Sequence, residues 1–186
     1  RLPLFGRRDR ELITRLRRWP VTHIGLSFVC TAADVAEARR EFARRGARVE
    51  IVSKIETAAA MQNLHAILAS GEIFMLDRGD LASEIGLEHL AEAQEHVLAA
   101  AAAAGASLIV ATQLLKTMEE NPIPFIAELT ELHRLLARGI FGLQLSEETA
   151  IGAGGILRKN FASAHRVRYK GRIDPVTEAD VKSEKY

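Results

Sequence analysis

The sequence lacks the features that mark several classes of protein. It contains a single cysteine, Cys30, so a disulfide within the chain and a thiolate metal cluster are both excluded. Its longest apolar stretch, residues 97–111, is rich in alanine and is interrupted by Gly105 and Ser107. This stretch falls short of the roughly 20 strongly apolar residues that a membrane span needs. No apolar signal sequence follows the arginine-rich start. We therefore expect a cytoplasmic protein without a membrane partner.

Aromatic residues are also few, at 5% of the chain, but hydrophobic residues reach 48% and can build an aliphatic core. Arginines concentrate in residues 1–48, and carboxylates in residues 49–150. Leu12, Ile13 and Leu16 recur at helical spacing, which places the neighbouring arginines on a solvated helix face. Because no aromatic side chains alternate with these arginines for base stacking, we expect no nucleic-acid partner.

Strand and helix patterns alternate along most of the chain. The expected strands are 23–29, 49–53, 73–76, 108–111 and 142–145, and the expected helices are 32–45, 59–70, 87–104 and 125–138. Strands separated by helices of this length form right-handed βαβ units with a parallel sheet, so the fold class is α/β. Five units are too few to close a (β/α)₈ barrel. The periodicity fits either a small doubly wound domain or one part of a barrel.

Polar side chains follow the expected strands where they end. Lys54 and Glu56 stand two residues apart and so share one face of a strand. Residues 78–80 follow the next strand, residues 112–113 the next, and residues 146–148 the last. Ligands bind at the carboxyl ends of strands in parallel α/β folds. A lysine and two carboxylates there suit a divalent metal with an anionic substrate, although an ordinary ion-pair cluster would have the same composition.

The order and spacing of these motifs resemble the pyruvate kinase family over residues 2–150. The motifs are Ser53-Lys54-Ile55-Glu56, Arg78-Gly79-Asp80-Leu81, Ala111-Thr112-Gln113-Leu114-Leu115, Asn121-Pro122 with Ala127-Glu128, and Leu145-Ser146 with Glu148-Thr149-Ala150. The resemblance implies the last five βα units of a (β/α)₈ TIM-type barrel. It also implies that the first three strands and a nucleotide-covering lid domain lie upstream of Arg1.

The resemblance assigns roles to matching residues. Lys54 corresponds to the catalytic lysine, which also contacts the substrate and stabilises charge on the phosphoryl group and the enolate. Glu56 and Asp80 correspond to the carboxylate ligands of Mg²⁺. The backbone at Gly79 and Asp80 and the hydroxyl of Thr112 correspond to the groups that bind the substrate carboxylate. A potassium ion is also implied, and its ligands and the nucleotide contacts are expected in the upstream segment.

The implied activity is the Mg²⁺-dependent phosphoryl transfer of glycolysis between phosphoenolpyruvate and ADP, giving pyruvate and ATP, in a protein that is a homo-oligomer when complete. Several residues depart from the family pattern, which has arginine at Cys30, asparagine at Thr57, glycine at Ala82, a small residue at Asp77 and glycine at Glu147. Two alternatives therefore stay open. One is a metal-dependent lyase or decarboxylase that forms enolpyruvate. The other is a non-catalytic pseudoenzyme or regulatory fusion, which Asp77 and Glu147 suggest, because two added carboxylates weaken binding of an anionic substrate unless a cation or basic group balances them.

A second resemblance covers residues 151–186, which we treat as a separate domain from residues 1–150. Residues 154–161 and the run 167–180 resemble the start of an inositol monophosphatase-type domain. The resemblance implies a helical C-terminal extension, with a helix beginning near Thr177 and Asp180. A polar helical tail that fits the pattern by chance is the alternative.

Overall fold

The computed structural model describes residues 4–152, 168–169 and 175–176. The chain divides into two compact units. The first comprises Arg1–Leu115 with Phe125–Ser146, and the second comprises Lys116–Pro124 with Glu147–Tyr186.

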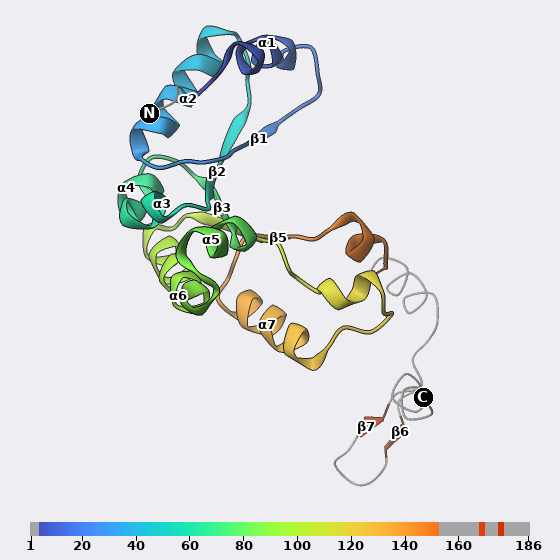
Figure 1. Cartoon of the computed structure of the whole chain (residues 1–186). Coiled ribbons are helices and arrows are strands. Elements are labelled where there is room, and N and C mark those ends of the chain that lie inside the picture. Colours follow the sequence, from blue (N-terminus) through green and yellow to red (C-terminus); the bar gives the residue numbers. More distant parts are fainter. Residues whose placement is uncertain (1–3, 153–167, 170–174, 177–186) are drawn as a thin grey trace. The chain divides into compact units, whose positions relative to one another are not determined.

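The first unit is built on a five-stranded parallel sheet (Figure 1). Its strands are β1 (His23–Leu26), β2 (Glu50–Ile55), β3 (Ile73–Asp77), β4 (Ser107–Ala111) and β5 (Gly142–Gln144). Neighbours in the sheet are neighbours in the sequence, in the order β1-β2-β3-β4-β5, and every pair is parallel. A doubly wound sheet reverses its strand order at a switch point, whereas a section of a barrel does not. The predicted α/β class is confirmed, and the strand order is consistent with part of a barrel.

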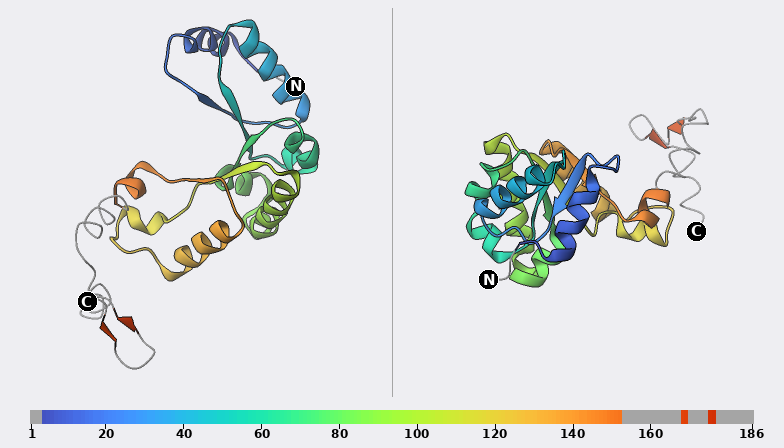
Figure 2. Two further views of the ribbon diagram at one scale, coloured as in Figure 1. Left: turned by 180° about the vertical axis from the view of Figure 1, so that it is seen from behind. Right: turned by 90° about the horizontal axis from the view of Figure 1, so that it is seen from above.

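Helices precede and connect the strands, and those over residues 32–44, 87–104 and 126–137 match expected ranges to within one residue at each end. The helices are α1 (Arg7–Leu16), α2 (Ala32–Arg44), α3 (Ala58–Gln62), α4 (Leu64–Leu68), α5 (Arg78–Ile85), α6 (Leu87–Ala104) and α7 (Ile126–Ala137). α4 packs against both α2 and α6, and the reverse view in Figure 2 also shows α4 and α6 side by side. α2, α4 and α6 thus form a continuous layer against the sheet.

The expected helix over residues 59–70 is wrong in one respect, because two short helices replace it. The backbone leaves the helical region at Asn63, which ends α3 and begins α4. The Asn63 side chain donates to the carbonyl oxygens of Cys30 at 3.1 Å and Ala59 at 3.0 Å. Asparagine competes readily with helical hydrogen bonding in this way.

Helix α5 was not expected from the sequence, since Gly79 and Asp80 are typical of a loop. It begins directly after β3, with Asp80 in its first turn, where a negative charge is favourable. It ends at Gly86, whose φ of 90° suits glycine. The segment before Asn121 forms a 3₁₀ turn, Lys116–Glu119, in the second unit.

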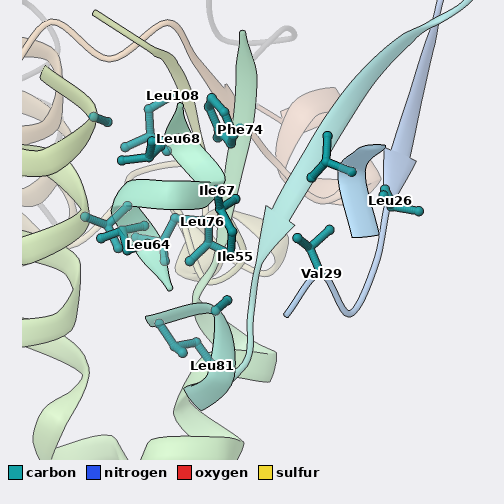
Figure 3. Packing of buried hydrophobic residues seen from close by; sticks show 14 of the residues in the cluster. Leu26, Val29, Ile55, Leu64, Ile67, Leu68, Phe74, Leu76, Leu81 and Leu108 are labelled. Atoms are coloured by element: carbon teal, nitrogen blue, oxygen red, sulfur yellow. The ribbon is translucent and has the colours of Figure 1, made fainter. Parts of the chain in front are cut away.

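The core lies between the sheet and its helices and is almost entirely aliphatic. Figure 3 shows Ile67 of α4 close to Ile55 of β2 and Leu76 of β3, and all three side chains are fully buried. The opposite face of the same strands carries Lys54, Met75 and Ile109, which are only partly buried. This difference between the two faces follows from the two-residue period of a strand. It leaves Lys54 on the face away from the helices.

In the second unit, residues 147–152 are helical, and β6 (Arg168–Tyr169) pairs antiparallel with β7 (Pro175–Val176). The helix predicted to begin near Thr177 and Asp180 lies outside the described residues. The four described residues beyond 152 are in strands, so they do not belong to a helical extension. Within the described part of the chain, no helix is both long and apolar enough to cross a membrane.

We predict that Leu76→Ala lowers the free energy of unfolding by about 3–5 kcal/mol, because Leu76 is fully buried and its loss leaves a cavity. Leu87→Ala is the matched control, since Leu87 is 72% exposed at the start of α6, and its change should stay within about 0.5 kcal/mol. Urea denaturation followed by circular dichroism measures both. Equal effects of the two substitutions would contradict the core described above.

Candidate functional site

Four charged side chains converge at the carboxyl ends of β2 and β3. Lys54 lies near the end of β2, and Glu56 immediately follows that strand. Asp77 is the last residue of β3, and Asp80 lies in the first turn of α5. Because Ile55 is in register with Leu76, the next residues of the two strands, Glu56 and Asp77, reach the same level.

Lys54 links two of the carboxylates. Its Nζ lies 2.6 Å from Glu56 Oε2 and 2.9 Å from Asp77 Oδ2, and it is 3.5 Å from the hydroxyl of Ser27. Burial disfavours the charged ammonium, but the contacts with Glu56 and Asp77 outweigh burial and raise the pKa of Lys54 above its ordinary value. The ammonium therefore stays protonated at neutral pH.

Glu56 has a fully buried side chain. Its Oε1 accepts a hydrogen bond of 2.6 Å from the backbone N–H of Phe28, which follows β1. Its Oε2 has the ion-pair contact with Lys54, yet no donor among the described residues meets it with hydrogen-bond geometry. A buried carboxylate oxygen without a hydrogen-bond donor is costly unless a cation balances it. The Lys54 ammonium supplies that cation here, and Oε2 keeps a lone pair that a metal ion could also use.

The carboxylates of Glu56, Asp77 and Asp80 can together hold a metal ion. One oxygen from each lies within 4.8 Å of the others, with Glu56 and Asp77 buried and Asp80 exposed. The cluster contains three carboxylates and one ammonium, that of Lys54, which pairs with Glu56 and Asp77, so carboxylates are in excess. Carboxylate oxygens are the ligands that Mg²⁺ prefers. The site fits a divalent cation, and it joins the two expected ligands, Glu56 and Asp80, to a third carboxylate.

Asp77 was read from the sequence as an added charge that would weaken binding of an anion unless a basic group balanced it. Its contact with Lys54 supplies that group. The strand register could have identified Asp77 as part of the site, because it places the residue beside Glu56. Glu147 and Glu148, at the last expected strand end, belong to the second compact unit.

Gly79 and Thr112 lie together at the end of β4. The backbone N–H of Gly79 donates to Thr112 Oγ1 at 2.8 Å, and the Thr112 hydroxyl donates to the carbonyl oxygen of Ala111 at 2.7 Å. The structure thus brings together two of the groups expected to bind the substrate carboxylate. In this state, each of them is hydrogen-bonded within the protein.

Several residues beside the site have positive φ angles, which are uncommon outside glycine. The values are 55° for Phe28, 66° for Thr112 and 51° for Gln113. Thr112 is β-branched, for which this conformation is a clear outlier. Such backbone strain persists only where the surrounding structure fixes it, and it is concentrated at functional sites. The turns after β1 and β4 are therefore held by specific contacts.

Arg78 supplies those contacts for the turn after β4. Its guanidinium donates to the carbonyl oxygen of Thr112 from both Nε, at 3.2 Å, and Nη2. Its Nη1 donates to Gln94 Oε1 of α6 at 3.3 Å and to Glu131 Oε1 of α7 at 3.4 Å. Gln94 also donates to Glu131 at 2.7 Å. Sequence reasoning did not anticipate this network, which joins three helices to the strained turn.

Burial lowers the pKa of Arg78, while Glu131 opposes the shift. A guanidinium nevertheless stays charged in proteins. The network thus contains a buried, paired cation whose removal would leave the Thr112 carbonyl without its donor and Glu131 with only its weaker partners, Gln94 and Arg134.

Comparison with known proteins relates this arrangement to one family. Residues 1–157 match the barrel domain of pyruvate kinase. The chain is 37% identical over 145 residues to a pyruvate kinase of Thermotoga maritima, which covers 78% of the chain and 31% of that protein. It is 34% identical over 151 residues to a pyruvate kinase of Methanocaldococcus jannaschii, covering 81% of the chain and 34% of the relative. For a pyruvate kinase of Dictyostelium discoideum the identity is 37% over 132 residues, which make up 71% of the chain and 26% of the relative. The chain spans about a third of the length of the curated relatives it matches.

We predict that Arg78→Met lowers the free energy of unfolding by about 2–3 kcal/mol, because it leaves the Thr112 carbonyl without its donor and removes one cation from the partly buried Glu131. Arg138→Met is the matched control. Arg138 forms an exposed ion pair with Glu95 at 2.6 Å, and its loss should cost at most about 1 kcal/mol. Chemical denaturation compares the two variants. If Arg138→Met lowered the free energy of unfolding as much as Arg78→Met does, burial of the Arg78 network would contribute nothing to stability.

Proposed function

Because the chain belongs to the pyruvate kinase family, we propose that it supplies the lysine and metal-binding part of a phosphotransferase site. The proposed reaction transfers a phosphoryl group between phosphoenolpyruvate and ADP, giving pyruvate and ATP. The observation that carries this proposal is the position of Lys54, whose protonated Nζ lies between the carboxylates of Glu56 and Asp77 and on the same side of the sheet as the metal ligands.

The reaction breaks the bond between phosphorus and the enol oxygen and forms a bond between phosphorus and a β-phosphate oxygen of ADP. The enolate left behind accepts a proton at its methylene carbon and becomes pyruvate. Negative charge develops on the transferring group and on the enolate oxygen, so a fixed positive charge at that position lowers the barrier. Lys54 fits this role because its contacts keep the ammonium charged and oriented.

Glu56 and Asp80 would hold Mg²⁺ in this proposal, with Asp77 as a third carboxylate close by. A bound Mg²⁺ would supply Lewis-acid stabilisation of charge on substrate oxygens. The Glu56 oxygen that lacks a hydrogen-bond donor supports the assignment, since it is already aimed into the cluster. Phe28 contributes by fixing the other oxygen through its backbone N–H.

The substrate carboxylate would bind at the first turn of α5. The backbone N–H groups of Gly79 and Asp80 lie at a helix N-terminus, where the helix dipole favours an anion, and Gly79 would exchange its hydrogen bond with Thr112 for one to the substrate. Thr112 would add its hydroxyl, exchanging its hydrogen bond with Ala111 for one to the substrate. The Arg78 network would hold Thr112 in the conformation that this contact requires.

Other features implied by the resemblance also remain predictions. They are the potassium ion, the nucleotide contacts, the homo-oligomer, the cytoplasmic location and the inositol monophosphatase-type domain beginning in residues 151–186. A metal-dependent lyase or decarboxylase is the second candidate, because Lys54 and a metal ion held by the three carboxylates would stabilise an enolate equally well without phosphoryl transfer. The pseudoenzyme alternative loses one of its two supports, since Asp77 is balanced by Lys54.

We predict that Lys54→Met, in the intact protein, lowers the rate of pyruvate formation from phosphoenolpyruvate and ADP by about 10²–10³-fold, the usual cost of removing one fixed charge stabiliser. The rate is measured with a coupled assay, in which a second enzyme reduces the pyruvate as it forms. The increase in melting temperature that Mg²⁺ produces should remain in the variant, because the carboxylates that bind the metal are retained.

An unchanged turnover in Lys54→Met would remove this residue from catalysis. Pyruvate release that requires a divalent metal but no ADP would instead favour the lyase.

We predict that Asp80→Asn abolishes the stabilisation of the protein by Mg²⁺. At a Mg²⁺ concentration of roughly ten times its Kd, the parent should melt about 3–6 °C higher than in chelator. In chelator the melting temperature of the variant should equal or exceed that of the parent. Asp80 is exposed, and removing its charge relieves repulsion from Glu56 and Asp77. Glu92→Gln, which changes an exposed carboxylate of α6, is the control and should keep the full response to Mg²⁺.

A parent melting temperature that ignores millimolar Mg²⁺, together with a less stable Asp80→Asn variant in chelator, would identify a structural charge cluster instead of a metal site.

A further inference from the structure

A second concentration of charge lies on α1 and at the end of α2, among residues that the proposed active site does not use. It forms a pocket of about 490 Å³. Six arginines and one carboxylate provide its charged lining, with Thr14 as a neutral neighbour; they are Arg7, Arg10, Arg15, Arg17, Arg18, Arg45 and Glu11. We call this feature the arginine pocket. The arginines of this segment are exposed, as expected for a solvated helix face, and together with Arg45 at the end of α2 they line a concave space.

The few carboxylates nearby balance only part of this charge. Arg7 pairs with Glu11 at 3.2 Å. Arg10 and Arg45 share Glu41 at 3.6 and 2.6 Å, and Arg44 contacts the same carboxylate at 2.7 Å. Hydrogen bonds from Arg45 and Arg44 lower the pKa of Glu41, so this group is ionised, yet it meets three guanidinium groups. An excess of positive charge therefore remains in the arginine pocket.

Three of the lining arginines contribute most to this excess. Arg15, Arg17 and Arg18 are exposed, and within the described part of the chain none of them forms an ion pair or a side-chain hydrogen bond. By contrast, Arg45 is anchored, since it donates to Thr14 Oγ1 at 3.0 Å as well as to Glu41. The pocket thus combines a fixed guanidinium with free ones around a shared space.

We propose that the arginine pocket binds a small anion with two or more linked phosphate groups. Guanidinium groups form bidentate hydrogen bonds to phosphate oxygens, and several of them around one cavity can engage adjacent phosphates together. The volume lies within the range of small-molecule sites, roughly 300–1,000 Å³. This inference does not depend on the proposed phosphotransferase activity.

A nucleic acid is a poorer fit for the same charge. Its strand needs an extended basic surface with aromatic platforms, and none of the residues lining this pocket is aromatic. A membrane surface is also a poorer fit, because an amphipathic helix binds lipid through its apolar face, and Ile13 of α1 is buried in the protein core. A compact polyphosphate is left as the ligand that matches both the charge and the shape.

The only tryptophan of the chain reports on this pocket. Trp19 follows Arg18 directly and is half exposed, so its fluorescence should respond when a ligand orders the neighbouring arginine. We expect titration of the full chain with sodium tripolyphosphate, in chelator and at constant ionic strength, to change Trp19 fluorescence with a single saturable isotherm. Isothermal titration calorimetry should give the same Kd, and sodium sulfate at equal ionic strength should give no saturation.

The decisive comparison uses two double variants that remove the same charge. Arg15→Gln with Arg18→Gln changes the pocket, and Arg8→Gln with Arg40→Gln changes two exposed arginines that do not line it. The first pair should weaken binding of tripolyphosphate by at least about tenfold, because it removes two of the cations that would contact phosphate. The second pair of substitutions should change the Kd for tripolyphosphate by no more than about twofold. Both double variants should have the melting temperature of the parent.

Absence of saturable binding by both fluorescence and calorimetry would overturn the proposal, as would equal losses in the two double variants, which would indicate unspecific attraction. An oligonucleotide or phosphatidylglycerol vesicles that bind more tightly than tripolyphosphate at the same salt concentration would also overturn it and assign the surface to a nucleic acid or a membrane.

Discussion

The buried carboxylate of Glu56 is the constraint on which the site depends. A carboxylate without solvent contact must be balanced by donors and cations, or its burial would cost several kcal/mol. The Phe28 amide serves one oxygen, and Lys54 contacts the other. Both requirements fix neighbouring structure: the turn after β1 must bring the Phe28 N–H inward, and β2 must place Lys54 and Glu56 on the same face. The positive φ of Phe28 is a consequence of the first requirement.

The junction between β3 and α5 then distributes four consecutive residues among different partners. Asp77 contacts Lys54, Arg78 holds the Thr112 carbonyl, the Gly79 amide donates to the Thr112 hydroxyl, and Asp80 joins the carboxylate cluster. This is possible because the chain changes from strand to helix at Arg78, which turns successive side chains in different directions. A loop at this position would not fix the positions of these four residues relative to one another, whereas a helix does. The early start of α5 therefore positions both the cation side and the anion side of the proposed site.

Much of this arrangement follows from short-range sequence patterns. The period of two in β2 correctly places Lys54 and Glu56 on one face, and alternation of strands and helices correctly predicts a parallel sheet. What could not be predicted depends on contacts between distant residues. Gly79 and Asp80 favour a loop by local propensity, and only packing of α5 against its neighbours overrides that preference. The left-handed turn at Thr112 likewise has no local signal, since the contact that holds it comes from Arg78, 34 residues earlier.

The charge balance at the cluster explains how Asp77 could be accommodated beside the proposed anionic substrate. Three carboxylates and one ammonium leave two negative charges, which one divalent cation would neutralise. The third carboxylate therefore does not repel the substrate, provided that the cation is present. Asp77 also gives Lys54 a second partner at 2.9 Å. A lysine paired with Glu56 alone would compete directly with a cation for the same oxygen, Oε2. With Asp77 alongside, Lys54 can keep a carboxylate contact while Glu56 Oε2 serves as a ligand, so the added charge makes the lysine and the metal compatible in one small site.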